Sequence, residues 1–114
     1  MARGYNFKLD VYIKFANKEY QENGNSVFFQ SICDKIIKGE NPTDNYIFAT
    51  SVKGVNAKKH GEIVIIKGDE YLNFLYATEV QGADIDAHRA VIEKSNNKKL
   101  LEKFDREFTD IHDL

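Results

Sequence analysis

The sequence lacks the features that usually stabilise a small extracellular domain or anchor a chain in a bilayer. Cys33 is the only cysteine among 114 residues, so no disulfide can form within the chain. Secreted domains of this size usually depend on paired cysteines, so this composition favours the cytoplasm. The first ten residues lack the apolar run of a signal peptide. No segment approaches the roughly 18 apolar residues that cross a bilayer, so we expect no membrane partner.

The chain also lacks a strong net charge and any visible internal repeat. A formal net charge of −2 argues against a polycation for nucleic acid and against a mimic of DNA. Apolar residues make up 42% of the chain, which is enough to build a folded core and argues against disorder. No repeat, low-complexity tract or linker is evident. We therefore expect residues 1–114 to form one domain.

Four segments have the pattern of β-strands. In residues 5–15 the side chains Tyr5, Phe7, Leu9 and their odd-numbered successors are apolar, and most even-numbered residues are polar. This period of two is typical of a strand with one buried face. Residues 45–52, 62–66 and 71–80 are rich in aromatic and β-branched residues and are predicted as three further strands.

Three other segments have the spacing and the end signals of helices. Residues 26–38 carry an apolar stripe at helical spacing, with Asn25 or Ser26 as the cap. Asp84 and Asp86 open a second helix that extends to about residue 94, and a third runs from about 97 to 108. The predicted order is β-α-β-β-β-α-α. The predicted fold class is α+β, with a four-stranded, mainly antiparallel sheet and helices packed on one face.

Two groups of residues could carry chemistry, and each has a simpler structural explanation. Asp84, Asp86 and His88 alternate, which in an extended segment would suit three metal ligands, but at a helix start Asp84 is an N-cap. Cys33 falls within the apolar stripe of its helix, where a cysteine usually packs as a small hydrophobe. We therefore predict no catalytic residue, no metal site and no cofactor.

The outer face of the predicted sheet is the candidate binding surface. Tyrosines and aliphatic side chains there would form an apolar patch, beside a basic segment at 52–67. The predicted binding residues are Tyr12, Lys14, Ile47, Tyr71, Asn73, Leu75, Lys58, Lys59 and His60. A competing explanation is that the 17–25 loop or the C-terminal tail covers this face.

The sequence thus predicts a small, non-enzymatic protein-interaction domain. Its size and lack of a catalytic motif suit an inhibitor or immunity-type protein of a phage or mobile element, which masks a protein partner through its sheet face or forms a homodimer. The alternative is an RNA or single-stranded DNA binder that uses the sheet tyrosines and the basic segment.

Overall fold

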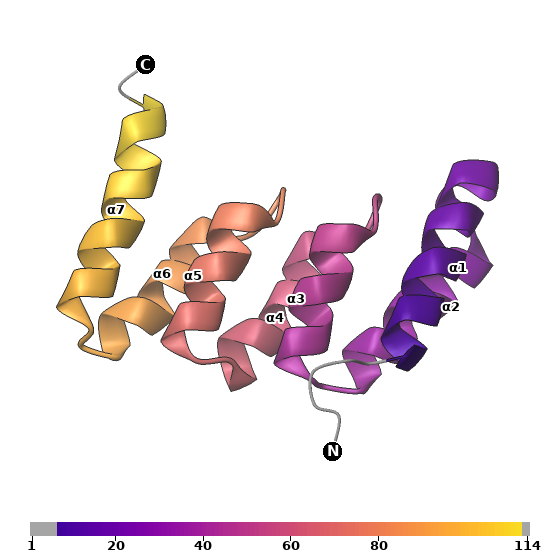
Figure 1. The fold of residues 1–114 in the computed structure, drawn as a ribbon, viewed down its shortest axis with the longest axis horizontal. Helices are drawn as coiled ribbons and strands as arrows, with labels where there is room; N and C mark the ends of the chain where they lie inside the picture. Colours follow the sequence, from indigo (N-terminus) through magenta and orange to yellow (C-terminus); the bar gives the residue numbers. More distant parts are fainter. Residues whose placement is uncertain (1–6, 113–114) are drawn as a thin grey trace.

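The structure, a computed structural model, describes residues 7–112, and these fold into helices (Figure 1). The seven helices of this range are α1 (Phe7–Asn23), α2 (Val27–Lys38), α3 (Pro42–Ser51), α4 (Ala57–Lys67), α5 (Glu70–Glu79), α6 (Ile85–Lys94) and α7 (Lys98–His112). No strand occurs between residues 7 and 112. The predicted α+β class, its four-stranded sheet and the order β-α-β-β-β-α-α are therefore wrong.

The alternating segment at 5–15 belongs to α1, apart from residues 5 and 6, which lie outside the described range. The same segment also carries apolar residues at helical spacing, which continue beyond it. Leu9 and Ala16 are buried, and Tyr12, Ile13 and Tyr20 pack against the same cluster. A helix brings residues three or four apart onto one face, so α1 buries this set together. The polar stretch after residue 15 extends the helix instead of ending a strand.

The other three predicted strands are the helices α3, α4 and α5, and each begins at a side-chain cap. Asn41, Asn56 and Asp69 accept hydrogen bonds from the backbone N–H three residues later, at 2.9, 3.1 and 2.8 Å. Pro42 occupies the first turn of α3, where its missing N–H costs nothing. These start signals, together with tertiary packing, outweigh the strand propensity of the aromatic and β-branched residues that follow.

The three predicted helices are confirmed as α2, α6 and α7. Ser26 caps α2, with the Phe29 N–H donating to its Oγ at 3.0 Å. Asp84 caps α6, and Asp86 lies in the first turn of that helix, near the positive end of its dipole. The backbone of α7 extends to His112, beyond the predicted end at 108.

The helices form two parallel rows. Helices α1, α3, α5 and α7 contact one another in sequence along the front row of Figure 1, and α2, α4 and α6 contact one another behind them. The molecule measures 41 × 40 × 20 Å, and its short dimension matches two layers of helices. The chain is therefore a linear stack of antiparallel helical hairpins, with α7 as an unpaired last helix.

The stack rests on a sequence repeat of 28 residues that our sequence analysis missed. Residues 41–68 form α3 and α4, and residues 69–96 form α5 and α6. Six residues of the first repeat recur unchanged in the second: Asn45, Ala49, Thr50, Val52, Gly54 and His60 return as Asn73, Ala77, Thr78, Val80, Gly82 and His88. Asn97, which caps α7, is the counterpart of Asn41 and Asp69, so α7 begins a third copy.

One recurring residue, glycine, fixes the turn between the two helices of each repeat. Gly54 and Gly82 have φ of +81° and +87°, a region in which other residues are strained. At Gly54 the ring of Tyr20 also occupies the space of a side chain, because a Cβ there would lie 2.2 Å from the ring. This contact seats the first hairpin against the second.

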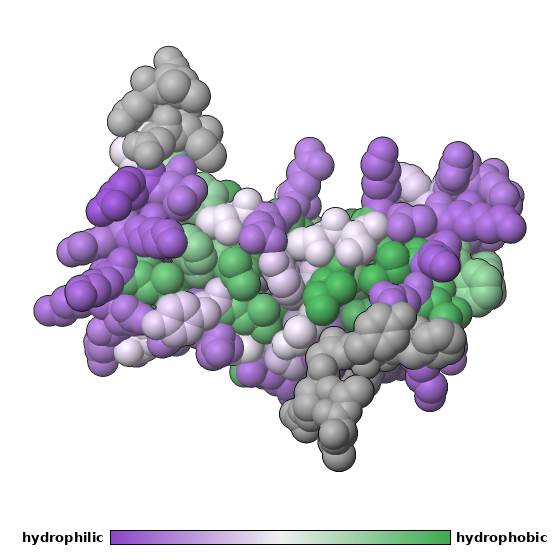
Figure 2. Space-filling model, in the orientation of Figure 1, coloured by the Kyte–Doolittle hydropathy of each residue, from purple (hydrophilic) through white to green (hydrophobic). Residues whose placement is uncertain are grey.

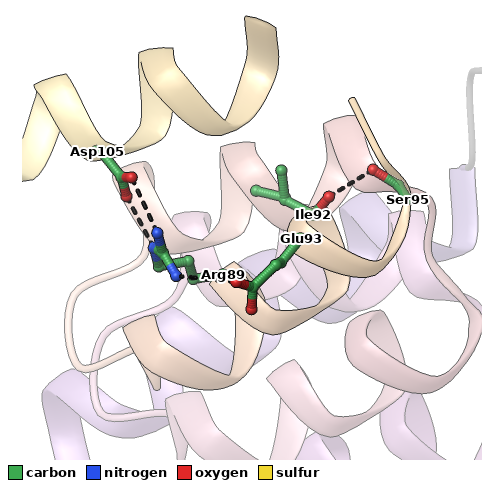
Figure 3. A network of polar contacts seen from close by, with 5 residues as sticks. All are labelled: Arg89, Ile92, Glu93, Ser95 and Asp105. Carbon is green, nitrogen blue, oxygen red and sulfur yellow. Dashed lines mark hydrogen bonds and ion pairs between the residues drawn. The ribbon is translucent and has the colours of Figure 1, made fainter. Parts of the chain in front are cut away.

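Helix α7 closes the stack by covering the apolar end of the second repeat. Leu100 and Phe104 pack against Ala77 and Ile92 in one buried cluster. At the edge of this cluster, Arg89 of α6 donates to both carboxylate oxygens of Asp105, at 2.8 and 2.9 Å (Figure 3). Such a two-point contact fixes the orientation of α7, although its exposure to water limits its energy to about 1 kcal/mol or less.

Candidate functional site

Two Asn–His pairs account for the buried polar residues in the part of the chain that the structure describes. The Oδ1 atom of Asn45 lies 2.7 Å from Nδ1 of His60, and the same distance separates Asn73 and His88. All four residues have no exposed surface. The pairs occupy equivalent places in the two repeats, so they belong to the repeat architecture.

The asparagine amides determine the tautomer of each imidazole. Nδ2 of Asn73 donates to the backbone oxygens of Val64 and Asp69, at 3.1 and 2.8 Å. Nδ2 of Asn45 donates in the same way to Ile36 and Asn41. Oδ1 is then left as the acceptor, so each histidine carries its proton on Nδ1 and donates it to asparagine.

Both histidines are held neutral. Burial lowers the pKa of His60 and of His88 to about 4, and the nearby carboxylates of Asp34 and Asp84 oppose this shift only in part. Each Nε2 is buried without a hydrogen-bond partner. An imidazole that is neutral, fully enclosed and fixed in one tautomer suits packing better than proton transfer with a substrate.

Aromatic rings enclose the two imidazoles. His88 stacks on Tyr76 with ring centroids 4.8 Å apart, and His60 lies 5.4 Å from the ring of Phe48. The hydroxyl of Tyr76 donates to the backbone oxygen of Ala57 at 2.5 Å. A Cβ at Gly61 would lie 3.0 Å from the Tyr76 ring and 3.1 Å from His88 Nε2, so glycine makes room for the stack.

The residues considered as metal ligands do not converge. Asp84 caps α6 and is exposed, Asp86 points outward from the first turn, and His88 is buried beside Asn73. No group of three His, Cys, Asp or Glu side chains with metal-binding geometry occurs among the residues that the structure describes. The interpretation of Asp84 as a helix cap is confirmed.

Cys33 packs in the core as the sequence indicates. It lies in the cluster formed by α1, α2 and α3, with 8% of its surface exposed. Burial raises the pKa of its thiol to about 11, and the carboxylate of Asp34 adds to this effect. The thiolate, which is the nucleophile, is therefore scarce at neutral pH.

Eight outward positions of α3 and α5 carry no charge, and we call the surface that they form the front face. Helical geometry places them opposite the residues that pack on the second row. The front face comprises Thr43, Tyr46, Ile47 and Thr50 of α3 and their repeat counterparts Tyr71, Phe74, Leu75 and Thr78 of α5. Glu79 of α5 is exposed at its edge and accepts a hydrogen bond from the hydroxyl of Tyr46. Figure 2 shows hydrophobic side chains gathered along the middle of this side of the molecule and hydrophilic ones at its edges.

The back row differs in character. The exposed positions of α4 and α6 carry mostly charged side chains, namely Lys58, Lys59, Glu62, Lys67, Asp86, Glu93 and Lys94. Ile66 and Ile85 are the large apolar exceptions on these two helices, with 76% and 38% of their surfaces exposed, and α2 of the same row exposes Val27 and Phe28. In a chain in which 30% of residues are charged, an uncharged front face is the more informative of the two sides.

The predicted binding residues separate into three groups. Ile47, Tyr71 and Leu75 lie on the front face, although they stand on helices instead of strands. Lys58 and Lys59 are exposed at the start of α4, in the back row. Asn73 and His60 are buried and have no surface to offer a partner.

The remaining two residues lie on α1. Tyr12 is half-buried and packs against the first hydrophobic cluster, whereas Lys14 is exposed. The nine residues therefore do not form one surface. The competing explanation, that a loop at 17–25 covers the face, loses that loop, because residues 17–23 belong to α1.

Sequence reasoning missed Phe74 and the uncharged row of α3, and one signal could have found them. The recurrence of Asn, Gly and His at a spacing of 28 residues marks two equivalent units, whose equivalent positions can then be compared. Such a comparison shows that residues 43, 46, 47 and 50 and their counterparts are uncharged in both units.

None of the helices in the described range is both long and apolar enough to cross a membrane. Comparison of the chain with family models, with curated proteins and with solved structures finds no match.

Proposed function

We propose that this protein is a non-catalytic binding module that recruits or masks a protein partner through its front face. Stacked helical hairpins present a broad, rigid surface whose side chains are fixed by the repeat, and repeat proteins commonly use such surfaces for binding. The observation that supports the proposal most directly is the uncharged character of this face on both α3 and α5.

The mixture of residues on the front face also suits an interface. Tyr71 is 57% exposed, and Phe74 and Leu75 beside it are half-buried. Aromatic side chains offer a large contact area at a small cost in conformational entropy and are enriched at protein interfaces. The threonines add hydroxyl groups around these anchors. A single cysteine, with no disulfide, supports a site of action in the cytoplasm.

The nucleic-acid alternative loses its structural premise. It required tyrosines on the outer face of a sheet, and residues 7–112 contain no sheet. Tyr12 is half-buried against a hydrophobic cluster, and Lys58 and Lys59 lie at the start of α4 in the back row, whereas Tyr71 lies on α5 in the front row. We therefore propose a protein partner only.

The test compares variants of the two sides of the molecule. Thr43→Arg/Tyr71→Arg places two charges on the front face, and Ile66→Arg places one on an exposed apolar position of the back row. Partner capture from source-cell extract and light scattering of the pure protein would measure binding and self-association. We expect wild type and Ile66→Arg to bind one defined partner, and the double variant to lose it while its circular dichroism stays helical. Equal capture by all three proteins would contradict the proposal.

A further inference from the structure

A groove between α5 and α7 borders the front face. It has a volume of about 460 Å³, within the range of sites that enclose a ligand side chain or a small molecule. Its walls are mainly apolar, and its rim carries amines and an amide. The lining residues are Tyr71, Phe74, Leu75, Leu100, Asn97, Lys99 and Lys103.

Two lysines of α7 border the front face at this groove. In the register of the repeat, Lys99 and Lys103 take the places that Tyr71 and Leu75 hold in α5. Neither lysine forms an ion pair among the described residues, and no carboxylate lines the groove. Glu102, the neighbour of Lys103 on α7, does not line the groove, so the two amines are the charged groups of its lining.

Phe74, which forms part of the apolar wall of the groove, contacts both a lysine of the rim and the core. Nζ of Lys103 lies 5.5 Å from the centre of the Phe74 ring, within the range of a cation–π contact. Phe74 in turn packs edge-on against Phe104, with centroids 6.1 Å apart. The Phe74 ring is thus held in place by the core before a ligand binds, so its ordering adds no cost to binding.

One donor also points into this region. Nδ2 of Asn97 donates to the hydroxyl oxygen of Tyr71 at 3.2 Å. The hydroxyl hydrogen of Tyr71 has no acceptor among the described residues, so it can donate to a ligand oxygen. An apolar slot with two unpaired amines and a phenol donor on its rim is complementary to an apolar side chain flanked by carboxylates.

We propose that the α5–α7 groove binds an acidic peptide segment of the partner, with one aromatic or large aliphatic side chain seated between Phe74, Leu75 and Leu100. Lys99 and Lys103 contact the carboxylates on either side of this anchor, and the Tyr71 hydroxyl donates to a peptide oxygen. This assignment rests on the proposed function and names the chemistry of the partner.

The test uses three short fluorescein-labelled peptides. The first is rich in Asp and Glu around one central Phe, the second has Ser in place of that Phe, and the third has Lys in place of the acids. Fluorescence anisotropy at low and at physiological salt measures affinity for the intact protein. We expect the first peptide to bind, the second to bind about tenfold more weakly and the third not to bind.

Two charge-reversal variants of equal net charge locate the site. Lys99→Glu/Lys103→Glu alters the groove, and Lys58→Glu/Lys59→Glu makes the same change at exposed positions in the back row. We expect the groove variant to lose affinity for the acidic peptide about tenfold or more and the control variant to keep it within about twofold. Equal losses in both variants would overturn the assignment, because they would show attraction to overall charge. Preference for a single-stranded oligonucleotide, or for a second copy of the chain, over the acidic peptide would overturn it as well.

The two proposals can fail separately. If Tyr71→Arg removes partner capture but the acidic peptide does not bind, the front face is an interface and the acidic chemistry of its partner is wrong. If partner capture is insensitive to every front-face variant, the proposed function itself is wrong.

Discussion

The Nδ1 atom of His88 lies 2.7 Å from Oδ1 of Asn73, and the proton between them belongs to the imidazole. Asn73 cannot supply it, because its Nδ2 donates to two backbone oxygens. The same arrangement joins His60 and Asn45 one repeat earlier. The second nitrogen of each ring is buried without a partner, so protonation there would place a charge in the core.

We therefore predict that the protein loses stability in mild acid. Each histidine has a pKa of about 4 when folded and about 6.5 when unfolded, so the unfolded state takes up protons first. The stabilisation is complete above pH 6.5 and decreases as pH falls toward 4, by about 1.4 kcal/mol per pH unit for each ring. Urea unfolding at a series of pH values measures it.

A histidine variant provides the control for this pH dependence. In His88→Gln, an amide that does not titrate can still donate to Asn73. We expect this variant to show about half of the wild-type pH dependence between pH 6.5 and 5. A free energy of unfolding that is flat over this interval in the wild-type protein would contradict the neutral, buried state of both rings.

Replacement of Asn73 by leucine should cost about 2–4 kcal/mol of stability. The shapes are similar, but the change leaves His88 Nδ1 without its acceptor in the core and removes one of the two hydrogen bonds to the backbone oxygen of Val64, which still accepts from the Gly68 N–H. The chain itself suggests this substitution, because Leu101 holds the equivalent place in α7. Chemical denaturation monitored by circular dichroism measures the loss. A cost below 1 kcal/mol would show that the pair contributes little.

Alanine at Gly54 should be more damaging than alanine at Gly24. Both glycines have positive φ, at +81° and +66°, so both variants carry the backbone strain of about 1 kcal/mol. Only at Gly54 does the new Cβ meet the Tyr20 ring, which packs on Phe29 with centroids 5.0 Å apart. We expect Gly54→Ala to cost about 1–3 kcal/mol more than Gly24→Ala. Equal thermal midpoints for the two variants would show that the ring moves freely.

Cys33 should resist thiol reagents while the protein is folded. The thiol is buried and its pKa is raised to about 11, so both access and thiolate formation are restricted at pH 8. The rate of modification by an aromatic disulfide reagent, followed by absorbance, should rise by orders of magnitude in concentrated urea. Rapid labelling of the native protein would show that α2 separates readily from α1 and α3.

The ends of helices were easier to predict from the sequence than the class of the fold. The caps at Asn25 or Ser26 and at Asp84 are predictable because a short polar side chain before an apolar stripe has a local, well-defined role, and the structure selects Ser26 for the first. Asn41, Asn56 and Asp69 are caps of the same kind, but the aromatic and β-branched residues behind them resemble strands. Strand propensity reflects packing in a sheet, and this chain packs those side chains between helices.

Only three of the predicted binding residues lie on the front face, because the prediction assumed a sheet. Tyr71 and Leu75 are four residues apart, a spacing that places two side chains on the same face of a helix and also on the same face of a strand. Ile47 is the repeat counterpart of Leu75 and lies on the same side of the molecule. The burial of Asn73 and His60 could not be inferred from their polarity, since buried polar residues are found only through their partners. The 28-residue period would have identified those partners, because it pairs each Asn with the His fifteen residues later.

Each buried asparagine joins three helices, and this arrangement sets the cooperativity of the molecule. Asn73 stands on α5, binds the backbone of α4 in the preceding hairpin and binds His88 on α6. Asn45 joins α2, α3 and α4 in the same way. In a linear array, cooperative melting requires that the interfaces between units are strong relative to the units themselves. Because separation of neighbouring hairpins would break these buried hydrogen bonds, α2 to α6 should melt as one unit, and their amide protons should exchange through a single opening event.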